Sequence, residues 1–490
     1  MWTVAMRWTI RLLGVVSVSI LARLLDRADF GLVAMATAAS ALPQVFLDLG
    51  LEIAVVREKN PQPSLYNTAW TIRFLQMACI AVLIFFTAPL VADFYGDARI
   101  EDIFRVLAFI VFIQGSENIW IVSFSKTFRF GKDFVYFSSV KFISVIVTII
   151  LAITFRSYWA LVFGQLSASL IRTTISYFIV PEKPRWTLVD WRKLWAFSQW
   201  NLLRGLASYI ARNSDRLILG KLASAPIVGA YTVGREVSEL PAGEISSPIN
   251  RVIAPSFSEM QYQPRRLASA AKKSLAALCT IVMPVSFGIG ACANQIVPVL
   301  LGDKWMSTIP IIQLLALSGI FTAPQNMLTT IQTVIGHVAL AVVNVWLRAT
   351  IVLTVGIGAS MMWGALGMAG TMLLASMAGA TFTLFMTCRH LPELSFGSAL
   401  ATAGRPLLAC LLMLPAVYAW DFSGLSNVFV LLALKAVTGA VVYAAMTFLF
   451  WRLAGCPDGL ERMLLDGMHK GFGHVKGLRA RILARPSSAS

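Results

Sequence analysis

Residues 7–57 read RWTIRLLGVVSVSILARLLDRADFGLVAMATAASALPQVFLDLGLEIAVVR, an apolar segment of membrane length, a short polar break and a second apolar segment. A helix needs about 20 mostly apolar residues to cross the hydrocarbon core of a bilayer. The first segment carries Arg7 and Arg11 one helical turn apart on a single face. An arginine at membrane depth costs roughly 2.5–3.5 kcal/mol on insertion scales. The two arginines therefore indicate a polar cavity, unless they snorkel to the membrane edge.

The composition of the whole chain indicates a membrane protein. Of its 490 residues, 57% are hydrophobic and 13% are charged, and the mean hydropathy is +0.73, whereas soluble chains average about 25% charged residues. The six cysteines have no CxxC spacing, the four histidines are scattered, and the sequence contains no P-loop. We therefore predict no enzyme, no metal site and no cofactor. The first apolar segment is too long and too charged for a cleaved signal peptide, so we expect it to remain a helix.

Apolar runs of spanning length recur along the chain with short breaks between them. They predict an all-α, polytopic membrane protein with about fourteen transmembrane helices. The expected spans are 2–24, 30–56, 67–92, 103–125, 134–155, 158–180, 195–220, 226–250, 274–300, 307–335, 338–359, 363–388, 403–421 and 425–451.

The distribution of Lys and Arg predicts the orientation, because cytoplasmic loops of membrane proteins carry the excess of these residues. With the amino terminus in the cytoplasm, the inside loops and the tail hold most of the Lys and Arg in the loops, and the outside loop 93–102 is net acidic. We therefore expect both termini in the cytoplasm. The net charge of +17 then reflects orientation and attraction to the anionic leaflet, and not binding to nucleic acid.

An internal repeat appears when the sequence is aligned with itself at an offset of 198 residues, so that position 31, for example, falls on position 229. The shift places the seventh expected helix on the first and the eighth on the second, so both halves have the same orientation and predict a parallel pseudo-twofold repeat. Chance matching between apolar segments is the alternative interpretation. The matching positions are Leu21 with Leu219, Arg23 with Lys221, Leu24 with Leu222, Gly31 with Gly229, Ser40 with Ser238, Leu42 with Leu240, and Pro43 with Pro241.

The repeat predicts the organisation of the chain. We expect two six-helix lobes followed by two extra helices at the carboxyl end. The expected boundaries are 1–182 for the first lobe, 183–194 for a cytoplasmic linker, 195–390 for the second lobe, 403–451 for the extra pair and 452–490 for a basic cytoplasmic tail.

The seventh expected helix repeats the arginine pattern of the first. Arg204, Ser208, Arg212 and Asp215 share one face, and Asp215 is expected to pair with Arg212. Ion pairs that lock helices together explain part of this pattern. The excess of arginine favours a cavity for an anionic ligand, because arginine makes two-pronged contacts with phosphate.

The opening of the sequence resembles that of a known family. The motifs that carry the resemblance are RLLG at 11–14, ILARLL at 20–25, DFGLVAMA at 29–36 and DLGL at 48–51. These motifs are similar to the opening of bacterial polysaccharide transporters, the O-antigen and exopolysaccharide flippases and lipopolysaccharide biosynthesis proteins. That family lies within the multidrug/oligosaccharidyl-lipid/polysaccharide exporter superfamily. The resemblance implies two six-helix bundles around a V-shaped cavity. It also implies a location in the bacterial plasma (inner) membrane.

The same resemblance implies a function and a set of site residues. The cargo would be an undecaprenyl-diphosphate-linked oligosaccharide, a repeat unit of exopolysaccharide, capsule or O-antigen, moved from the inner to the outer leaflet. The implied partners are this lipid-linked oligosaccharide, the membrane and other polysaccharide assembly proteins. The implied diphosphate-binding residues are Arg7, Arg11, Arg204 and Arg212. Candidate coupling or structural acids are Asp48, Glu117 and Asp215.

Two alternatives remain. A cation-coupled multidrug exporter of the same superfamily would favour acidic residues in its cavity, whereas the expected spans carry more arginine than acid. A membrane polysaccharide polymerase or ligase would need a sizeable external loop for its catalytic residues, and the expected external loops are short.

Overall fold

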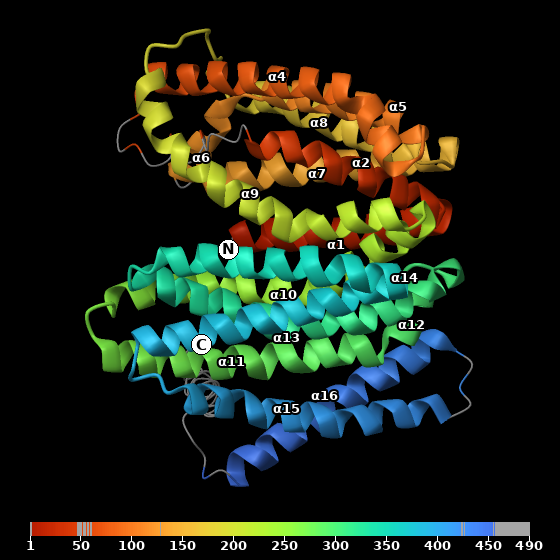
Figure 1. The fold of residues 1–490 in the computed structure, drawn as a ribbon, viewed down its shortest axis with the longest axis vertical. Coiled ribbons are helices and arrows are strands. Elements are labelled where there is room, and N and C mark those ends of the chain that lie inside the picture. Colours follow the sequence, from red (N-terminus) through yellow and green to blue (C-terminus); the bar gives the residue numbers. More distant parts are fainter. Residues whose placement is uncertain are drawn as a thin grey trace, which may run out of the picture. The chain divides into compact units, whose positions relative to one another are not determined.

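The computed structural model describes residues 2–46, 61–127, 129–422 and 427–453, together with residues 51, 55, 58, 425 and 455. These residues form helices and connecting turns without any strand, so the predicted all-α class is confirmed (Figure 1). The elements are α1 (Trp2–Leu24), α2 (Arg27–Phe46), α4 (Pro63–Tyr95), α5 (Arg99–Gly115), η1 (Ile119–Ile121), α6 (Val122–Lys126), α7 (Phe130–Phe155), α8 (Trp159–Ile179), α9 (Trp191–Leu222), α10 (Ala225–Glu259), α11 (Pro264–Ala291), α12 (Ala293–Leu300), η2 (Asp303–Thr308), α13 (Ile309–Val334), α14 (Val338–His390), α15 (Phe396–Tyr418), η3 (Ala419–Phe422) and α16 (Val428–Leu453).

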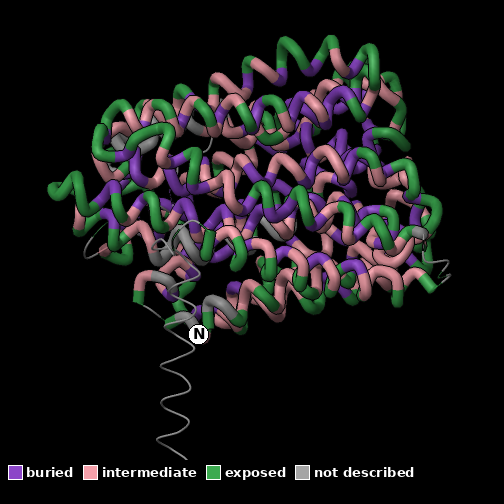
Figure 2. Tube along the Cα trace, turned by 90° about the horizontal axis from the view of Figure 1, so that it is seen from below, coloured by how far each residue is buried: buried purple, intermediate pink, exposed green. Residues whose placement is uncertain are grey.

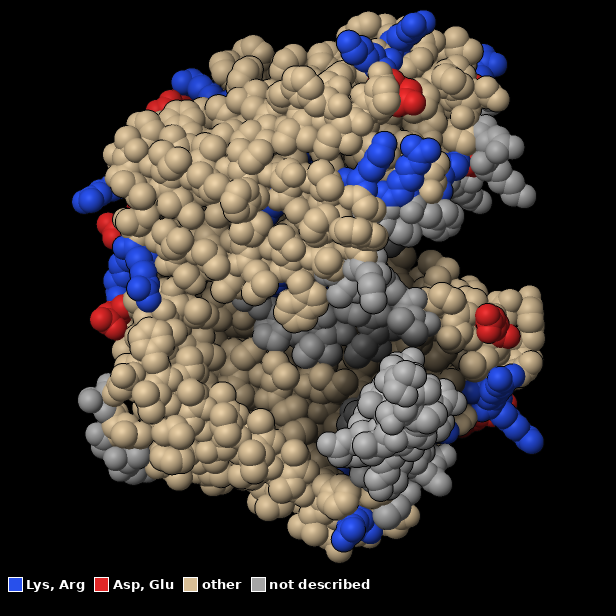
Figure 3. All heavy atoms as spheres, turned by 180° about the vertical axis from the view of Figure 1, so that it is seen from behind, with Lys and Arg blue, Asp and Glu red and all other residues tan. Residues whose placement is uncertain are grey.

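The helices have the length and composition of membrane spans. Eight helical segments among the described residues are long and apolar enough to cross a bilayer. One of them, α14, turns at Gly364 with φ 57° and ψ −134°, and therefore contains the two expected spans 338–359 and 363–388. On the face drawn in Figure 3, charged side chains gather toward the left and right of the view, and a broad surface with few charges lies between them. The order and lengths of the helices are consistent with the expected fourteen transmembrane spans.

The chain forms two compact units that alternate along the sequence. Unit 1 comprises Met1–Val237, Ile296–Leu315 and Val345–Ala375, and unit 2 comprises Ser238–Gln295, Ala316–Asn344 and Ser376–Ser490. Helices α10, α12, α13 and α14 therefore contribute residues to both units. The boundaries expected from the repeat describe a different division, and they stay a prediction.

The core of unit 1 joins both halves of the chain. Its main apolar cluster includes Leu32 of α2, Ile84 of α4 and Phe104 of α5, together with Tyr231 of α10 and Met368 of α14. Buried positions follow the inner faces of the helices and exposed positions follow their outer faces (Figure 2). Because lipid tails are as apolar as these side chains, close van der Waals packing holds such helices together. The cluster includes residues near the ends of α4 and α9 and near the starts of α2, α5, α10 and α13. The ends of α1 and α12 meet at the same end of the unit, where Arg23 contacts Val299. We call this end of unit 1 the Arg23 end.

Unit 2 is held by polar contacts between helices as well as by apolar packing. Helices α15 and α16 pack against each other and against α11, where the Tyr443 hydroxyl donates to the Thr280 carbonyl over 2.8 Å. Within the same unit, Gln325 of α13 donates to Asn344 of α14 over 3.2 Å. Asn344 in turn donates to the carbonyl of Gly379 over 2.9 Å. Such amide contacts across helices join membrane bundles.

Candidate functional site

A buried carboxylate marks the point where α5 ends. The chain leaves α5 at Gly115 and turns through Ser116, Glu117 and Asn118 before η1 begins. The Asn118 side chain accepts from the Trp120 amide over 3.1 Å and donates to the Glu182 carbonyl over 2.8 Å. These contacts fix the turn, and they leave Glu117 only 4% exposed.

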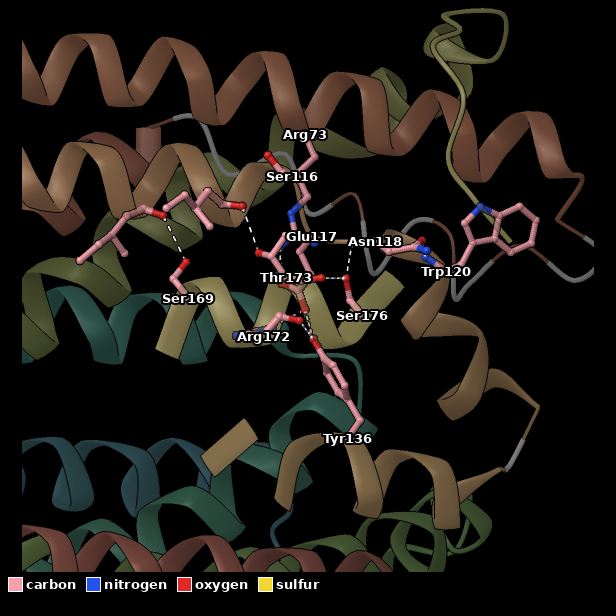
Figure 4. A network of polar contacts seen from close by, with 12 residues as sticks. Arg73, Ser116, Glu117, Asn118, Trp120, Tyr136, Ser169, Arg172, Thr173 and Ser176 are labelled. Atoms are coloured by element: carbon pink, nitrogen blue, oxygen red, sulfur yellow. Dashed lines mark hydrogen bonds and ion pairs between the residues drawn. The ribbon is translucent and has the colours of Figure 1, made fainter. Parts of the chain in front are cut away.

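Helix α8 donates to two carbonyl groups at the end of α5. The hydroxyl of Thr173 donates to the Ile113 carbonyl over 3.2 Å, and that of Tyr177 donates to the Ser116 carbonyl over 2.8 Å. The last four carbonyls of a helix lack the usual partner four residues on, and the Ile113 carbonyl accepts from the Ser116 amide over 3.0 Å as well as from Thr173. Polar residues of α8 thus help to fix the end of α5 next to Glu117 (Figure 4).

Three helices bring donors to the Glu117 carboxylate (Figure 4). Its Oε1 accepts from Nε of Arg172 on α8 over 2.9 Å and from the hydroxyl of Tyr136 on α7 over 2.8 Å. Its Oε2 accepts from Arg73 on α4 over 3.1 Å. The Arg73 side chain is 14% exposed, and that of Arg172 is 45% exposed. The cluster ties α4, α7 and α8 to the end of α5.

A second buried acid lies in α9. Asp215 is fully buried, and its Oδ2 accepts from the hydroxyl of Tyr231 over 2.8 Å and forms an ion pair with Arg235. Both partners belong to α10. Arg235 also donates to the carbonyl of Arg212 over 3.1 Å. This arrangement ties α9 to α10.

The expected pair of Arg212 with Asp215 is wrong. Arg212 is exposed, and its Nε donates to the Ser208 carbonyl of its own helix over 3.2 Å. Residues three apart lie about 60° apart around a helix axis. That difference directs Asp215 toward α10 and leaves Arg212 on the open side of α9.

The remaining candidate residues have these positions. Arg7 and Arg11 lie on α1 with partly buried side chains. Arg204 lies on α9, but its side chain falls outside the described residues, as does all of Asp48. A diphosphate-binding role for the arginines stays a prediction. No cluster of three metal-ligating side chains occurs within the described ranges.

Sequence reasoning missed a buried lysine in the final helix. Lys435 of α16 is fully buried, pairs with Asp421 of η3, and lies 3.2 Å from the side-chain oxygen of Gln295. Its Nζ also lies 5.8 Å from the centre of the Tyr418 ring. A single charge within the apolar run VFVLLALKAVTG was the signal that could have identified it. Arg73, Glu117 and Arg172 all lie in the expected spans, but the sequence did not show that they pair.

The fold is that of known transporters. The "Lipid II flippase MurJ, inward closed conformation" matches with a TM-score of 0.76 and 14% sequence identity, covering 91% of this chain and 98% of that one. The "Inward-facing conformation of a multidrug resistance MATE family transporter of the MOP superfamily" matches with a TM-score of 0.54 over 80% of this chain and 94% of that one, also at 14% identity. The chain is thus a multi-pass membrane protein with the MurJ/MATE fold.

The sequence defines the family within this fold. Residues 20–310 match the polysaccharide biosynthesis protein family, and the chain belongs to it. The lipopolysaccharide biosynthesis protein WzxC of Escherichia coli is 24% identical over 64% of this chain and 65% of its own length. The succinoglycan biosynthesis transport protein ExoT of Rhizobium meliloti is 24% identical over 63% of each chain. The chain thus spans just under two thirds of the length of these curated relatives. The resemblance found in the sequence is confirmed.

Proposed function

We propose that the protein is a flippase that moves an undecaprenyl-diphosphate-linked oligosaccharide from the inner to the outer leaflet of the bacterial plasma membrane. The observation that carries this proposal is the likeness to the fold of a lipid II flippase over 91% of the chain. Relatives named for lipopolysaccharide biosynthesis and succinoglycan transport support a saccharide cargo. The proposed cargo is a repeat unit of exopolysaccharide, capsule or O-antigen.

Arginine supplies the proposed recognition of the cargo. Arg11 and Arg7 lie on α1 within a membrane-length helix, and Arg204 and Arg212 lie on α9. A guanidinium binds two phosphate oxygens at once. Coulomb attraction in a partly dehydrated cleft is several-fold stronger than in water, which offsets the cost of removing water from the diphosphate. The polyprenyl tail would remain in lipid while one lobe rocks against the other.

The buried acids suit structural roles in this conformation. Asp215 is bound by Arg235 and Tyr231, and Glu117 is bound by Arg73 and Arg172. An acid that carries a coupling ion would have to leave these partners during the cycle. We therefore assign Glu117 and Asp215 first to holding helices together and second to coupling.

The proposed orientation places both termini in the cytoplasm and the Arg23 end outside. Basic residues of the expected inside loops support this assignment. Lipid-linked oligosaccharide and the membrane are the proposed partners, with other polysaccharide assembly proteins acting before and after transport. The protein performs no catalysis in this scheme.

A multidrug exporter is the second candidate, because a multidrug resistance transporter shares the fold. The pairing of Glu117 and Asp215 with arginines argues against it, since a lipophilic cation needs free acidic groups. Short connections at the Arg23 end, such as 96–98, 156–158 and 223–224, argue against a polymerase or ligase.

The proposal is tested by expressing wild-type or variant protein in cells that lack the gene and measuring export of surface polysaccharide. The wild-type protein should restore surface polysaccharide, and Arg11→Ala or Arg204→Ala should leave lipid-linked oligosaccharide on the inner leaflet at normal protein abundance. Lysine at either position should restore export only partly, because it keeps the charge but loses the planar contact. Normal export by the double variant Arg11→Ala/Arg204→Ala would refute the diphosphate contact.

A further inference from the structure

Helices α2 and α10 cross at a pair of glycines in unit 1. A Cβ added at Gly31 would overlap the Ala225 carbonyl oxygen and lie 3.0 Å from the Gly229 nitrogen. A Cβ added at Gly229 would overlap the Arg27 carbonyl oxygen and lie 3.0 Å from the Gly31 nitrogen. Only glycine permits this approach of two backbones. The contact is reciprocal, as in a twofold interface.

The same symmetry governs two basic side chains at the Arg23 end. Arg23, at the end of α1, donates to the Val299 carbonyl at the end of α12 over 2.7 Å. Lys221, at the end of α9, donates to the Phe94 carbonyl at the end of α4 over 2.6 Å. A cation at the carboxyl end of a helix is favoured by the exposed carbonyls and the helix dipole. Each half of the chain therefore caps a helix of the other half.

A third group of contacts holds the turn between α1 and α2. Lys304 of η2 donates to the carbonyls of Arg23, over 3.2 Å, and of Leu25. The indole of Trp305, which is fully buried, donates to the Ala22 carbonyl over 2.8 Å. The end of α1 is thus fastened to residues of the second half.

We propose that the Arg23 end is an outer gate whose closure requires the Gly31–Gly229 crossing and the reciprocal caps by Arg23 and Lys221. The pairs Gly31 with Gly229, Arg27 with Ala225 and Arg23 with Lys221 all obey the spacing of the sequence repeat, 31 to 229. This gate rests on the proposed function, because alternating access requires the two halves to separate on the outside before cargo can leave. Hydrogen bonds from exposed cations to carbonyls can exchange with water, so the caps hold the gate reversibly.

Labelling from outside the cell tests the gate. Ala34, one turn beyond Gly31 and 8% exposed, is replaced by cysteine, and intact cells receive a membrane-impermeant maleimide. The same variants without Ala34→Cys measure labelling of the native cysteines. Gly31→Ala and Gly229→Ala should each raise the Ala34→Cys labelling rate roughly tenfold, as expected when a minor open state becomes dominant. Both should also reduce export, because the gate no longer closes.

Gly404→Ala is the matched control, because this glycine lies inside α15 and an added Cβ would meet no atom within 4 Å. Its labelling rate should equal that of wild type. The double variant Arg23→Gln/Lys221→Gln keeps the glycine crossing and should raise labelling several-fold, so it decides the matter if the alanine variants fail to insert. Wild-type labelling of every inserted gate variant would overturn the proposal.

The labelling readout is independent of cargo. Faster labelling of the gate variants would support the gate. If cells without any copy of the gene still made normal surface polysaccharide, that result would count against the proposed cargo and leave the gate supported. Arg11→Ala should give the opposite result, with export lost and labelling of Ala34→Cys unchanged.

Discussion

Three buried charged residues, Glu117, Asp215 and Lys435, form ion pairs with residues of other helical elements. Such pairing is expected in a membrane, where a lone charge is expensive. The sequence identified Glu117 and Asp215 but not their partners, because those partners lie far along the chain or on the neighbouring helix. Helical spacing alone favoured a pair within α9, and tertiary packing replaced it. The pairs are Glu117 with Arg73 and Arg172, Asp215 with Arg235, and Lys435 with Asp421.

Arg235→Gln should lower membrane abundance sharply, because it leaves the fully buried Asp215 without its cation. Breaking a buried pair costs about 3–5 kcal/mol. The double variant Asp215→Asn/Arg235→Gln should recover abundance, and Arg212→Ala should scarcely change it. Quantitative immunoblotting of membranes measures all three. Equal abundance of the single and double variants would contradict the pairing.

Lys435 and Asp421 should respond unequally to substitution. The Lys435 side chain is 0% exposed and that of Asp421 is 32% exposed. Asp421→Asn leaves a cation in the interior, whereas Lys435→Met leaves an acid that can reach water. We expect the first change to lower the thermal unfolding midpoint in detergent more than the second. The reverse order would show that the lysine is not the costly partner.

At the scale of the elements, apolar periodicity located the spans but not the interruptions within them. The span expected at 103–125 is broken by the turn at Glu117, where side chains of α8 replace the lost helical partners. The break expected at 360–362 lies instead at Gly364. Helix ends follow from hydrogen-bond partners supplied by other helices, and these are not visible in a local pattern.

The turn of α14 at Gly364 should tolerate only glycine. Its φ of 57° and ψ of −134° belong to a region that costs other residues about 1–3 kcal/mol. Gly364→Ala should therefore lower the unfolding midpoint. Gly370→Ala is the control, since this glycine is helical with no atom within 4 Å of an added Cβ, and alanine favours a helix. Equal midpoints for the two variants would mean that α14 can straighten without penalty.

At the scale of the whole molecule, composition and the opening motifs sufficed to predict the class, the fold and the family. The repeat was visible at widely spaced positions, and the structure adds that Gly31 and Gly229 are also in contact. The binding of cargo could not be predicted to the same degree. It depends on the side-chain positions of arginines such as Arg11 and Arg204, and sequence spacing assigns these only to a helix face.

Orientation is tested by reporters at three positions. Fusions at both ends of the chain should report cytoplasm, and one inserted after Asp97, between α4 and α5, should report the exterior. The physical reason is the excess of Lys and Arg in the expected inside loops. An external carboxyl terminus would mean an odd number of spans.

The buried lysine of α16 also bears on how the chain is inserted during synthesis. A charge within a span raises the cost of entering lipid, by roughly 2.5–3.5 kcal/mol at the centre, so α16 is a poor independent anchor. Its partner Asp421 precedes Lys435 by only 14 residues, so the two side chains emerge from the ribosome in close succession. Helices α15 and α16 are thus suited to enter the bilayer as a paired hairpin, with the ion pair formed before the lysine loses its water.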